Sequence, residues 1–143
     1  MSDFDAVKFV REQLGDRIHE SGKVFYSPLN TLTQGPIYLM GHNPGGAPDN
    51  SPINSIACNL DTMESKKMND YVGEKWGHHE EGQNKIQRSV RKLFEYLQVD
   101  LNAVFTTNLI FLGVVMSGAR TTIQMRQYAG ICIKNFCALL IPT

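Results

Sequence analysis

Hydrophobic residues recur along this chain in two different spacings. In three segments, residues 3–20, 83–98 and 122–141, they return every three or four positions, which predicts amphipathic helices. Two other segments, 37–40 and 104–112, are short runs of apolar, β-branched and aromatic residues bounded by turn residues, which predicts buried strands. The positions expected to face the core from the first two helices are Phe4, Val7, Val10, Leu14, Ile18, Ile86, Val90, Leu93 and Leu97.

The stretches between these elements carry weaker patterns. Residues 24–26 have the composition of a short strand. Residues 47–65 are rich in Pro, Asn, Asp and Ser, and so long a connection is more often functional than idle. One or two helical turns there and a short helix within 63–76 are expected. Their candidate inward positions are Ile53, Ile56, Leu60, Met68, Tyr71 and Val72.

The order helix, strand, helix, strand, helix predicts an α/β fold with parallel strands joined by crossover helices. We expect a single domain over residues 1–143, in three α/β/α layers around a small, mostly parallel sheet. Two clear strands make a sheet that leaves edges to be covered. We therefore expect the sheet to be incomplete at its C-terminal end, as if a strand after Pro142 were missing, or its open edge to be covered by a second copy of the chain.

The composition is that of an ordinary globular protein, with 42% hydrophobic and 20% charged residues. Fourteen basic residues balance fourteen acidic ones, so any surface that attracts nucleic acid must be local. Lys85, Arg88 and Lys92 share one face of the 83–98 segment, which is more simply a solvated outer face.

Nothing in the sequence indicates a membrane span or a signal peptide, because no apolar run approaches about 18 residues. Three widely spaced cysteines fit reduced thiols, which predicts a cytoplasmic protein. The cysteines form no Cys-x-x-Cys pair, and the adjacent His78 and His79 point apart, so neither a metal nor a cofactor is expected.

Candidate chemistry gathers in the loop after the first predicted strand. Residues 41–46 read Gly-His-Asn-Pro-Gly-Gly, in which the glycines allow close backbone approach to a ligand and the proline stiffens the turn. His42 and Asn43 are thereby presented at the carboxyl end of a strand, where open α/β sheets bind ligands. A tight turn with two polar residues facing water is the alternative interpretation.

Asn108 stands in the middle of the second predicted strand. A buried, unpaired amide costs about 1–3 kcal/mol, so this side chain must either find partners in the fold or offer its hydrogen bonds to a ligand. The sequence leaves both alternatives open.

Residues 41–45 resemble the first motif of the uracil-DNA glycosylase superfamily, and are closest to the Gly-x-Asn-Pro-Gly form of its mismatch-specific and single-strand-selective branches. Asn108, within Thr-Thr-Asn-Leu, resembles the asparagine with which those enzymes recognise the uracil edge. The similarity extends from about residue 24 to the end. The family's second catalytic segment, a His-Pro-Ser-like loop, would lie beyond Thr143, so we expect this chain to lack it.

The resemblance implies base flipping and hydrolysis of the N-glycosidic bond of uracil, or a related damaged base, in single-stranded or mismatched DNA, as in base-excision repair. Asn43 would orient the water, His42 would assist the departing uracil anion, and Asn108 would accept from N3–H and donate to O4. Further candidates for binding the base are Gly41, Pro44, Gly45 and Gly46, those for contacting DNA are Ser117 and Arg120, and those for stacking on the base are Phe25, Tyr26, Tyr71 and Trp76.

Two other functions fit the same sequence. A glycosylase-like domain without the second motif could be a non-catalytic module that binds nucleic acid or a nucleobase. Alternatively, the loop could serve an enzyme that acts on a free nucleotide or another small ligand. Binding to DNA should weaken steeply with salt, whereas binding to a free base should not.

Overall fold

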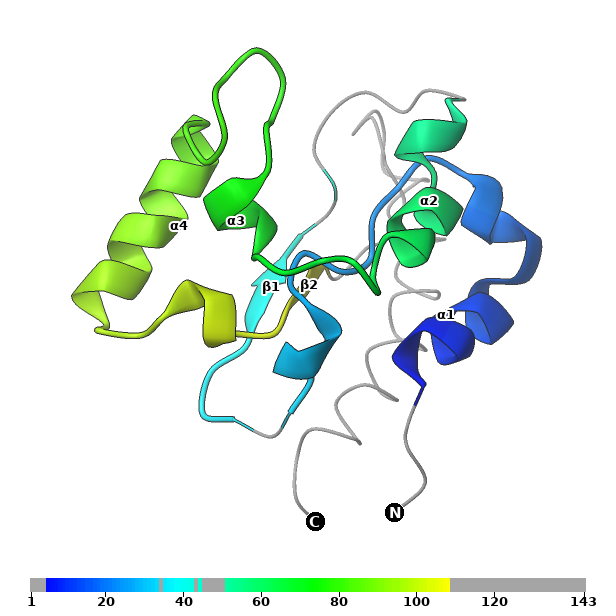
Figure 1. Cartoon of the computed structure of the whole chain (residues 1–143), viewed down its shortest axis with the longest axis horizontal. Coiled ribbons are helices and arrows are strands. Elements are labelled where there is room, and N and C mark those ends of the chain that lie inside the picture. Colours follow the sequence, from blue (N-terminus) through cyan, green and yellow to red (C-terminus); the bar gives the residue numbers. More distant parts are fainter. Residues whose placement is uncertain (1–4, 34, 43, 45–50, 109–143) are drawn as a thin grey trace, which may run out of the picture.

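The computed structural model describes residues 5–33, 35–42, 44 and 51–108 of the chain. Within them the fold combines helices with a small two-stranded parallel sheet, which confirms the mixed α/β class (Figure 1). The helices are α1 (Ala6–Leu14), α2 (Ile56–Asp61), α3 (Asp70–Gly73) and α4 (Lys85–Tyr96), and the strands are β1 (Leu39–Gly41) and β2 (Thr106–Asn108). Short 3-10 turns occupy Gly15–His19, Leu29–Thr31, Pro52–Asn54 and Leu101–Ala103.

The two strands pair in parallel, as the sequence predicts, and Gly41 of β1 lies beside Asn108 of β2. Three helices, α2, α3 and α4, separate the strands along the chain, as a crossover connection requires. A second neighbour of β2 is the chain at Phe25, which forms an antiparallel bridge to Thr107. The predicted second strand continued to residue 112, and its positions after 108 lie outside the described residues.

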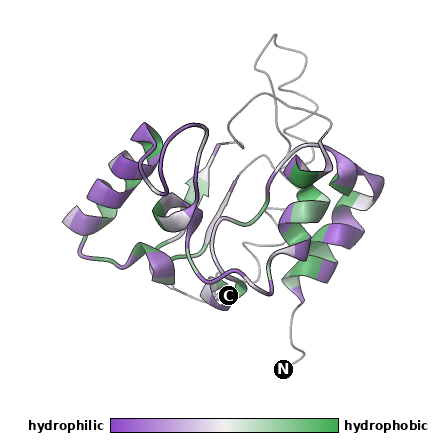
Figure 2. Cartoon of the chain, turned by 45° about the horizontal axis from the view of Figure 1, so that its top comes forward, coloured by the Kyte–Doolittle hydropathy of each residue, from purple (hydrophilic) through white to green (hydrophobic). Residues whose placement is uncertain are grey.

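One hydrophobic cluster involves α1 and α2, and we call it the α1–α2 cluster. Val10 and Leu14 are buried and Val7 is partly buried, which confirms the predicted stripe of the first helix at its described positions. The α-helix ends earlier than expected, because Gly15 adopts a left-handed φ of +52° and a 3-10 turn follows. Figure 2 shows hydrophobic faces on these helices, with hydrophilic residues on their other sides. The buried members are Ala6, Val10, Leu14, Val24, Phe25, Ile56, Leu60, Met63 and Phe105.

A second cluster joins α3 and α4 to the sheet, and we call it the cavity-side cluster. Its largest members are aromatic, and partly buried residues such as Leu39 and Trp76 pack against it. In contrast to the α1–α2 cluster, it adjoins many buried polar side chains, among them Asn69, Asp70 and Gln87. The buried hydrophobic members are Tyr26, Tyr71, Phe94, Leu101 and Val104.

The helix predicted over 83–98 is present as α4, and Val90 packs against the cavity-side cluster as predicted, but the other three predicted inward positions are wrong. Ile86, Leu93 and Leu97 are exposed by 59%, 51% and 44%, while Gln87 and Phe94 are buried. The buried face is therefore displaced by one residue, about 100° around the helix axis, from the apolar stripe. Figure 2 shows α4 as mostly hydrophilic.

Hydrogen bonds to α3 explain this orientation of α4. The amide nitrogen of Gln87 donates to the backbone oxygens of Asp70 and Glu74, at 2.8 Å each. Its side-chain oxygen accepts from the backbone N–H of Asn84 at 3.0 Å, completing the capping box at the start of α4. A four-residue helix such as α3 satisfies few of its carbonyls internally, so a buried amide that donates to the carbonyls of Asp70 and of the C-cap residue Glu74 outweighs an apolar side chain there.

The helical turns expected between the strands are also present. Ile56 and Leu60 of α2 are buried as predicted, whereas Ile53 is 76% exposed. In the next helix Tyr71 is buried as predicted, but Met68 precedes α3 and is 48% exposed. Among the helices in the described part of the chain, none has the length and apolar character to cross a membrane.

Candidate functional site

A cavity of about 910 Å³ opens beside the carboxyl end of the sheet. Asn108 at the end of β2 lines it, as does Pro44, in the loop that follows β1. The other lining residues come from segments 21–26, 53–66 and 71–86, which include α2, α3 and the start of α4. The cavity thus lies where the sequence placed a ligand, at the end of parallel strands.

Asn108 finds a partner within the fold. Its side chain is 2% exposed, and its amide nitrogen donates to the hydroxyl oxygen of Tyr26 at 2.9 Å. The bond uses one of the two amide hydrogens, and an amide oxygen can accept as well. Asn108 therefore satisfies part of its hydrogen-bonding capacity internally while it lines the cavity.

The position of the Asn108 side chain requires a glycine at residue 41. The two residues are paired across β1 and β2, and a Cβ atom at position 41 would lie 2.2 Å from Oδ1 of Asn108. It would also lie 3.5 Å from the Tyr71 hydroxyl. No side chain fits at position 41 unless Asn108 moves, so the first glycine of the loop motif serves the neighbouring strand.

Three aromatic rings form one wall of the cavity. The ring of Tyr71 lies 5.0 Å from that of Trp76 and 6.0 Å from that of Tyr26, in edge-on or tilted arrangements. Phe25, the fourth candidate for stacking on a base, lies instead in the α1–α2 cluster, 6.1 Å from the ring of Phe105. Of the four aromatic residues considered from the sequence, the structure brings three together at the cavity.

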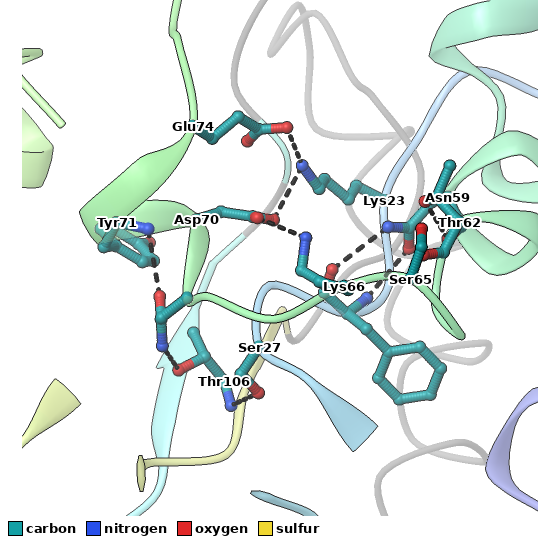
Figure 3. A network of polar contacts seen from close by, with 12 residues as sticks. Lys23, Ser27, Asn59, Thr62, Ser65, Lys66, Asp70, Tyr71, Glu74 and Thr106 are labelled. Atoms are coloured by element: carbon teal, nitrogen blue, oxygen red, sulfur yellow. Dashed lines mark hydrogen bonds and ion pairs between the residues drawn. The ribbon is translucent and has the colours of Figure 1, made fainter. Parts of the chain in front are cut away.

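A group of ion pairs borders the same cavity (Figure 3). Nζ of Lys23 lies 2.8 Å from Oδ2 of Asp70 and 2.5 Å from Oε1 of Glu74. Lys66 pairs with the other oxygen of Asp70. Nζ of Lys23 also lies 5.0 Å from the centre of the Tyr26 ring, within range of a cation–π contact. Through these ion pairs, Lys23 and Lys66 of the cavity wall contact Asp70 of α3, and Lys23 also contacts Glu74 just after it.

Burial and pairing shift the protonation equilibria of this group in different ways. Burial raises the pKa of Asp70, and the nearby lysines only partly offset that effect. Burial alone would lower the pKa of Lys23, but the carboxylates of Asp70 and Glu74 raise it above its ordinary value. The difference follows from the neighbouring charges, since Lys23 faces two carboxylates, whereas Asp70 faces the like charge of Glu74 as well as its lysines. Burial also raises the pKa of Tyr26, so its phenol is neutral at physiological pH.

Two buried asparagines position these groups. Asn59 of α2 accepts from the backbone N–H groups of Val24 and Phe25 at 2.9 and 3.0 Å, which fixes the segment that carries Lys23 and Tyr26. Asn69 caps α3, and its side-chain nitrogen donates to Thr106 Oγ1 of β2 at 2.7 Å and to the backbone oxygen of Leu101 at 3.1 Å.

The ion pairs and these two asparagines were not found from the sequence. Lys66, Asp70 and Glu74 recur every four residues, which is the spacing of one helix face, but α3 begins only at Asp70. Nothing in that pattern indicates Lys23, which lies far earlier in the chain. The spacing could have drawn attention to Asp70 and Glu74, but not to their shared partner.

The other predicted site residues are only partly described. His42 is exposed and is not among the residues that line the cavity, whereas Pro44 is buried and lines it. The remaining predicted residues, Asn43, Gly45, Gly46, Ser117 and Arg120, lie outside the described residues. Among the described residues, no three His, Cys, Asp or Glu side chains are grouped so that they could hold a metal ion.

Comparison of the chain with models of protein families, with curated proteins and with solved structures finds no match. The chemistry of the cavity and the short motifs beside it therefore carry the functional inference. A buried amide, three aromatic rings and paired charges make a cavity suited to a flat ligand with a polar edge.

Proposed function

We propose that the cavity holds a nucleobase, and that the protein is a uracil-DNA glycosylase-type hydrolase acting on uracil or a related damaged base in DNA. The observation that supports this most is the placement of Asn108. Its buried amide lines a cavity walled by aromatic rings, directly beside the glycine that begins the Gly-His-Asn-Pro-Gly motif.

In this proposal the ring of Tyr71 or Trp76 contacts the face of the flipped base, and Asn108 reads its edge. Oδ1 of Asn108 accepts from N3–H of uracil, and the amide hydrogen that is not bonded to Tyr26 donates to O4. Cytosine presents the opposite donor and acceptor at these positions, so the same amide would reject it.

Hydrolysis would proceed through an oxocarbenium-like sugar, for which a weakly activated water is sufficient. We assign the orientation of that water to Asn43, since a neutral amide is a poor base but can hold a water in place. His42 would assist the departing uracil anion. The C–N bond to the base breaks, water adds to the sugar carbon, and its proton leaves with the base or solvent.

A second candidate is a non-catalytic module that binds the same base. Glu74, the one carboxylate among the described residues that line the cavity, is paired with Lys23, and Asp70, which does not line it, is paired with Lys23 and Lys66. Neither is therefore placed as a free general base, which favours binding without hydrolysis if Asn43 cannot activate a water by itself.

The remaining parts of the proposal concern setting and partners. Single-stranded or mismatched DNA is the proposed substrate, and the cytoplasm is the proposed compartment. We also propose that the sheet belongs to a three-layer α/β/α arrangement, whose open edge a second copy of the chain could cover.

The test is release of uracil from a labelled single-stranded oligonucleotide with one central uracil. We expect release by the parent protein, and a loss of about 100-fold in Asn43→Ala, the scale on which a misplaced reactant lowers a rate. The matched control is Asn30→Ala, which removes an exposed asparagine from the turn after Pro28 and should leave release unchanged. No release by the parent would overturn the hydrolase proposal, and binding of the same oligonucleotide would then support the module.

A further inference from the structure

We infer that Tyr26 is a positioning residue that fixes which way the Asn108 amide faces, and so sets the preference of the cavity for uracil over cytosine. The inference rests on the proposed function, because it concerns the base edge that Asn108 reads.

The two ends of the Asn108 amide have different neighbours. Its nitrogen donates to the Tyr26 hydroxyl at 2.9 Å. Its oxygen lies against Gly41, so close that a Cβ atom there would be 2.2 Å away. If the amide turned over, its NH₂ group would face the C–H bonds of a glycine, which offer no acceptor. Together these contacts favour one orientation of the amide.

Tyr26 is itself held firmly enough to act as a reference point. Its backbone N–H donates to the Thr106 oxygen of β2 at 3.0 Å, and its own carbonyl accepts from the N–H of Asp70 at 2.7 Å. Its ring contacts two other aromatic rings and lies beneath the Lys23 ammonium. Its side chain therefore has little freedom to follow a rotating amide.

The consequence for recognition follows from the hydrogen-bonding pattern of each base. Uracil offers a donor at N3 and an acceptor at O4, whereas cytosine offers an acceptor at N3 and a donor at N4. An amide that can turn over serves either base equally well, while an amide held in one orientation serves only uracil. The Tyr26 hydroxyl therefore sets the preference for uracil by holding the amide in one orientation, although it need not contact the base itself.

The experiment compares Tyr26→Phe with Tyr71→Phe. Each change removes one hydroxyl from a buried tyrosine of the same aromatic wall, but only Tyr26 bonds to Asn108. Dissociation constants are measured for two single-stranded oligonucleotides that differ only in a central uracil or cytosine. We expect the uracil preference to fall at least tenfold in Tyr26→Phe, whereas Tyr71→Phe changes both affinities by the same factor.

The outcomes separate the inference from the proposed function. A parent protein with no preference for uracil overturns the proposed function and the inference with it. A parent with that preference, together with a Tyr26→Phe variant that keeps it, overturns the inference alone. A merely structural role for Tyr26 would lower both affinities and leave their ratio unchanged.

A second measurement keeps the inference testable if Tyr26→Phe does not fold. The side-chain amide signals of Asn108 in the ¹⁵N NMR spectrum of the parent are assigned by their loss in Asn108→Asp. We expect one amide proton to exchange with water much more slowly than the other, because it is bonded to Tyr26. Equal, rapid exchange of both protons would overturn the inference.

Discussion

The α1–α2 cluster and the cavity-side cluster differ in what surrounds their hydrophobic side chains. The first is built from residues such as Val10, Ile56 and Leu60, which are aliphatic and at most 2% exposed. The second is mainly aromatic and adjoins a buried ion-pair group and the amides of Asn69 and Gln87. Apolar contact dominates the first cluster, in which Asn59 fixes the backbone of Val24 and Phe25, whereas the second depends on a larger set of hydrogen bonds and ion pairs.

This difference supports our proposal that the ligand binds on the cavity side. The α1–α2 cluster offers few directional groups, while the cavity-side cluster already holds several donors and acceptors in fixed positions. The two clusters should therefore respond differently to substitution, and the experiments below are ordered from the largest expected effect to the smallest.

The largest effect is expected from Asp70→Ala on the cavity side. The change leaves the Lys23 and Lys66 ammonium groups, 19% and 13% exposed, without their buried carboxylate. Breaking a buried pair in this way costs about 3–5 kcal/mol of unfolding free energy, which urea denaturation measures. Asp61→Ala is the matched control, since Asp61 is 70% exposed and pairs with Arg11 at the surface, where a salt bridge contributes about 0–1 kcal/mol. Equal losses in the two variants would contradict the contrast.

Ile56→Ala tests the α1–α2 cluster and should be nearly as costly. Ile56 is fully buried, and truncating such a side chain to alanine costs about 2–5 kcal/mol. Its counterpart is Ile86→Ala on α4, where the side chain is 59% exposed and the expected change stays within about 0.5 kcal/mol. Thermal unfolding of both variants measures the two losses of stability. A large loss in Ile86→Ala would mean that the apolar stripe of α4 is buried after all.

Gln87→Leu places an apolar side chain at a fully buried position of α4, where a hydrophobic residue would ordinarily be expected to stabilise the fold. We nevertheless expect a loss of about 1–3 kcal/mol, because the carbonyls of Asp70 and Glu74 each lose the Gln87 donor and keep only one backbone N–H. Gln83→Leu, at an exposed position just before α4, is the control. An increase in stability in Gln87→Leu would show that packing, rather than hydrogen bonding, decides how α4 docks.

The smallest effect is a pH dependence confined to alkaline solution. The unfolded Tyr26 phenol ionises near its ordinary pKa of 10.0, while burial raises the pKa of the folded one, so the native state holds the proton longer. Stability must then fall as pH rises above 10.0, by up to about 1.4 kcal/mol per pH unit for one such group. The raised pKa of Lys23 acts in the same direction above 10.5. We expect Tyr26→Phe to show a shallower fall between pH 10 and 11.5, and an unchanged slope would contradict the assignment.

The same contrast explains how much of the fold the sequence could predict. The buried face of α1 follows from apolar spacing because only apolar contacts determine it. The location of α4 was also predictable, but not its face, which depends on bonds from Gln87 to carbonyls 17 and 13 residues earlier. No local pattern encodes such a pairing.

The candidate site shows the same limit. That Asn108 needs hydrogen-bond partners could be predicted from the cost of burying an amide. That one partner is Tyr26 could not, because the two residues are 82 positions apart in the chain. The motif around Gly41 suggested contact with a ligand, whereas the structure also gives that glycine a role inside the sheet.

The register of the sheet has a consequence for how this protein can vary. Because Gly41 lies beside Asn108 with no room for a Cβ atom, positions 41 and 108 cannot change independently. A larger residue at 41 becomes tolerable only after the asparagine has been replaced by something shorter, and the amide is lost in that step. A lineage in which position 108 no longer carried an asparagine would be free to lose this glycine, so the two residues should be kept or lost together.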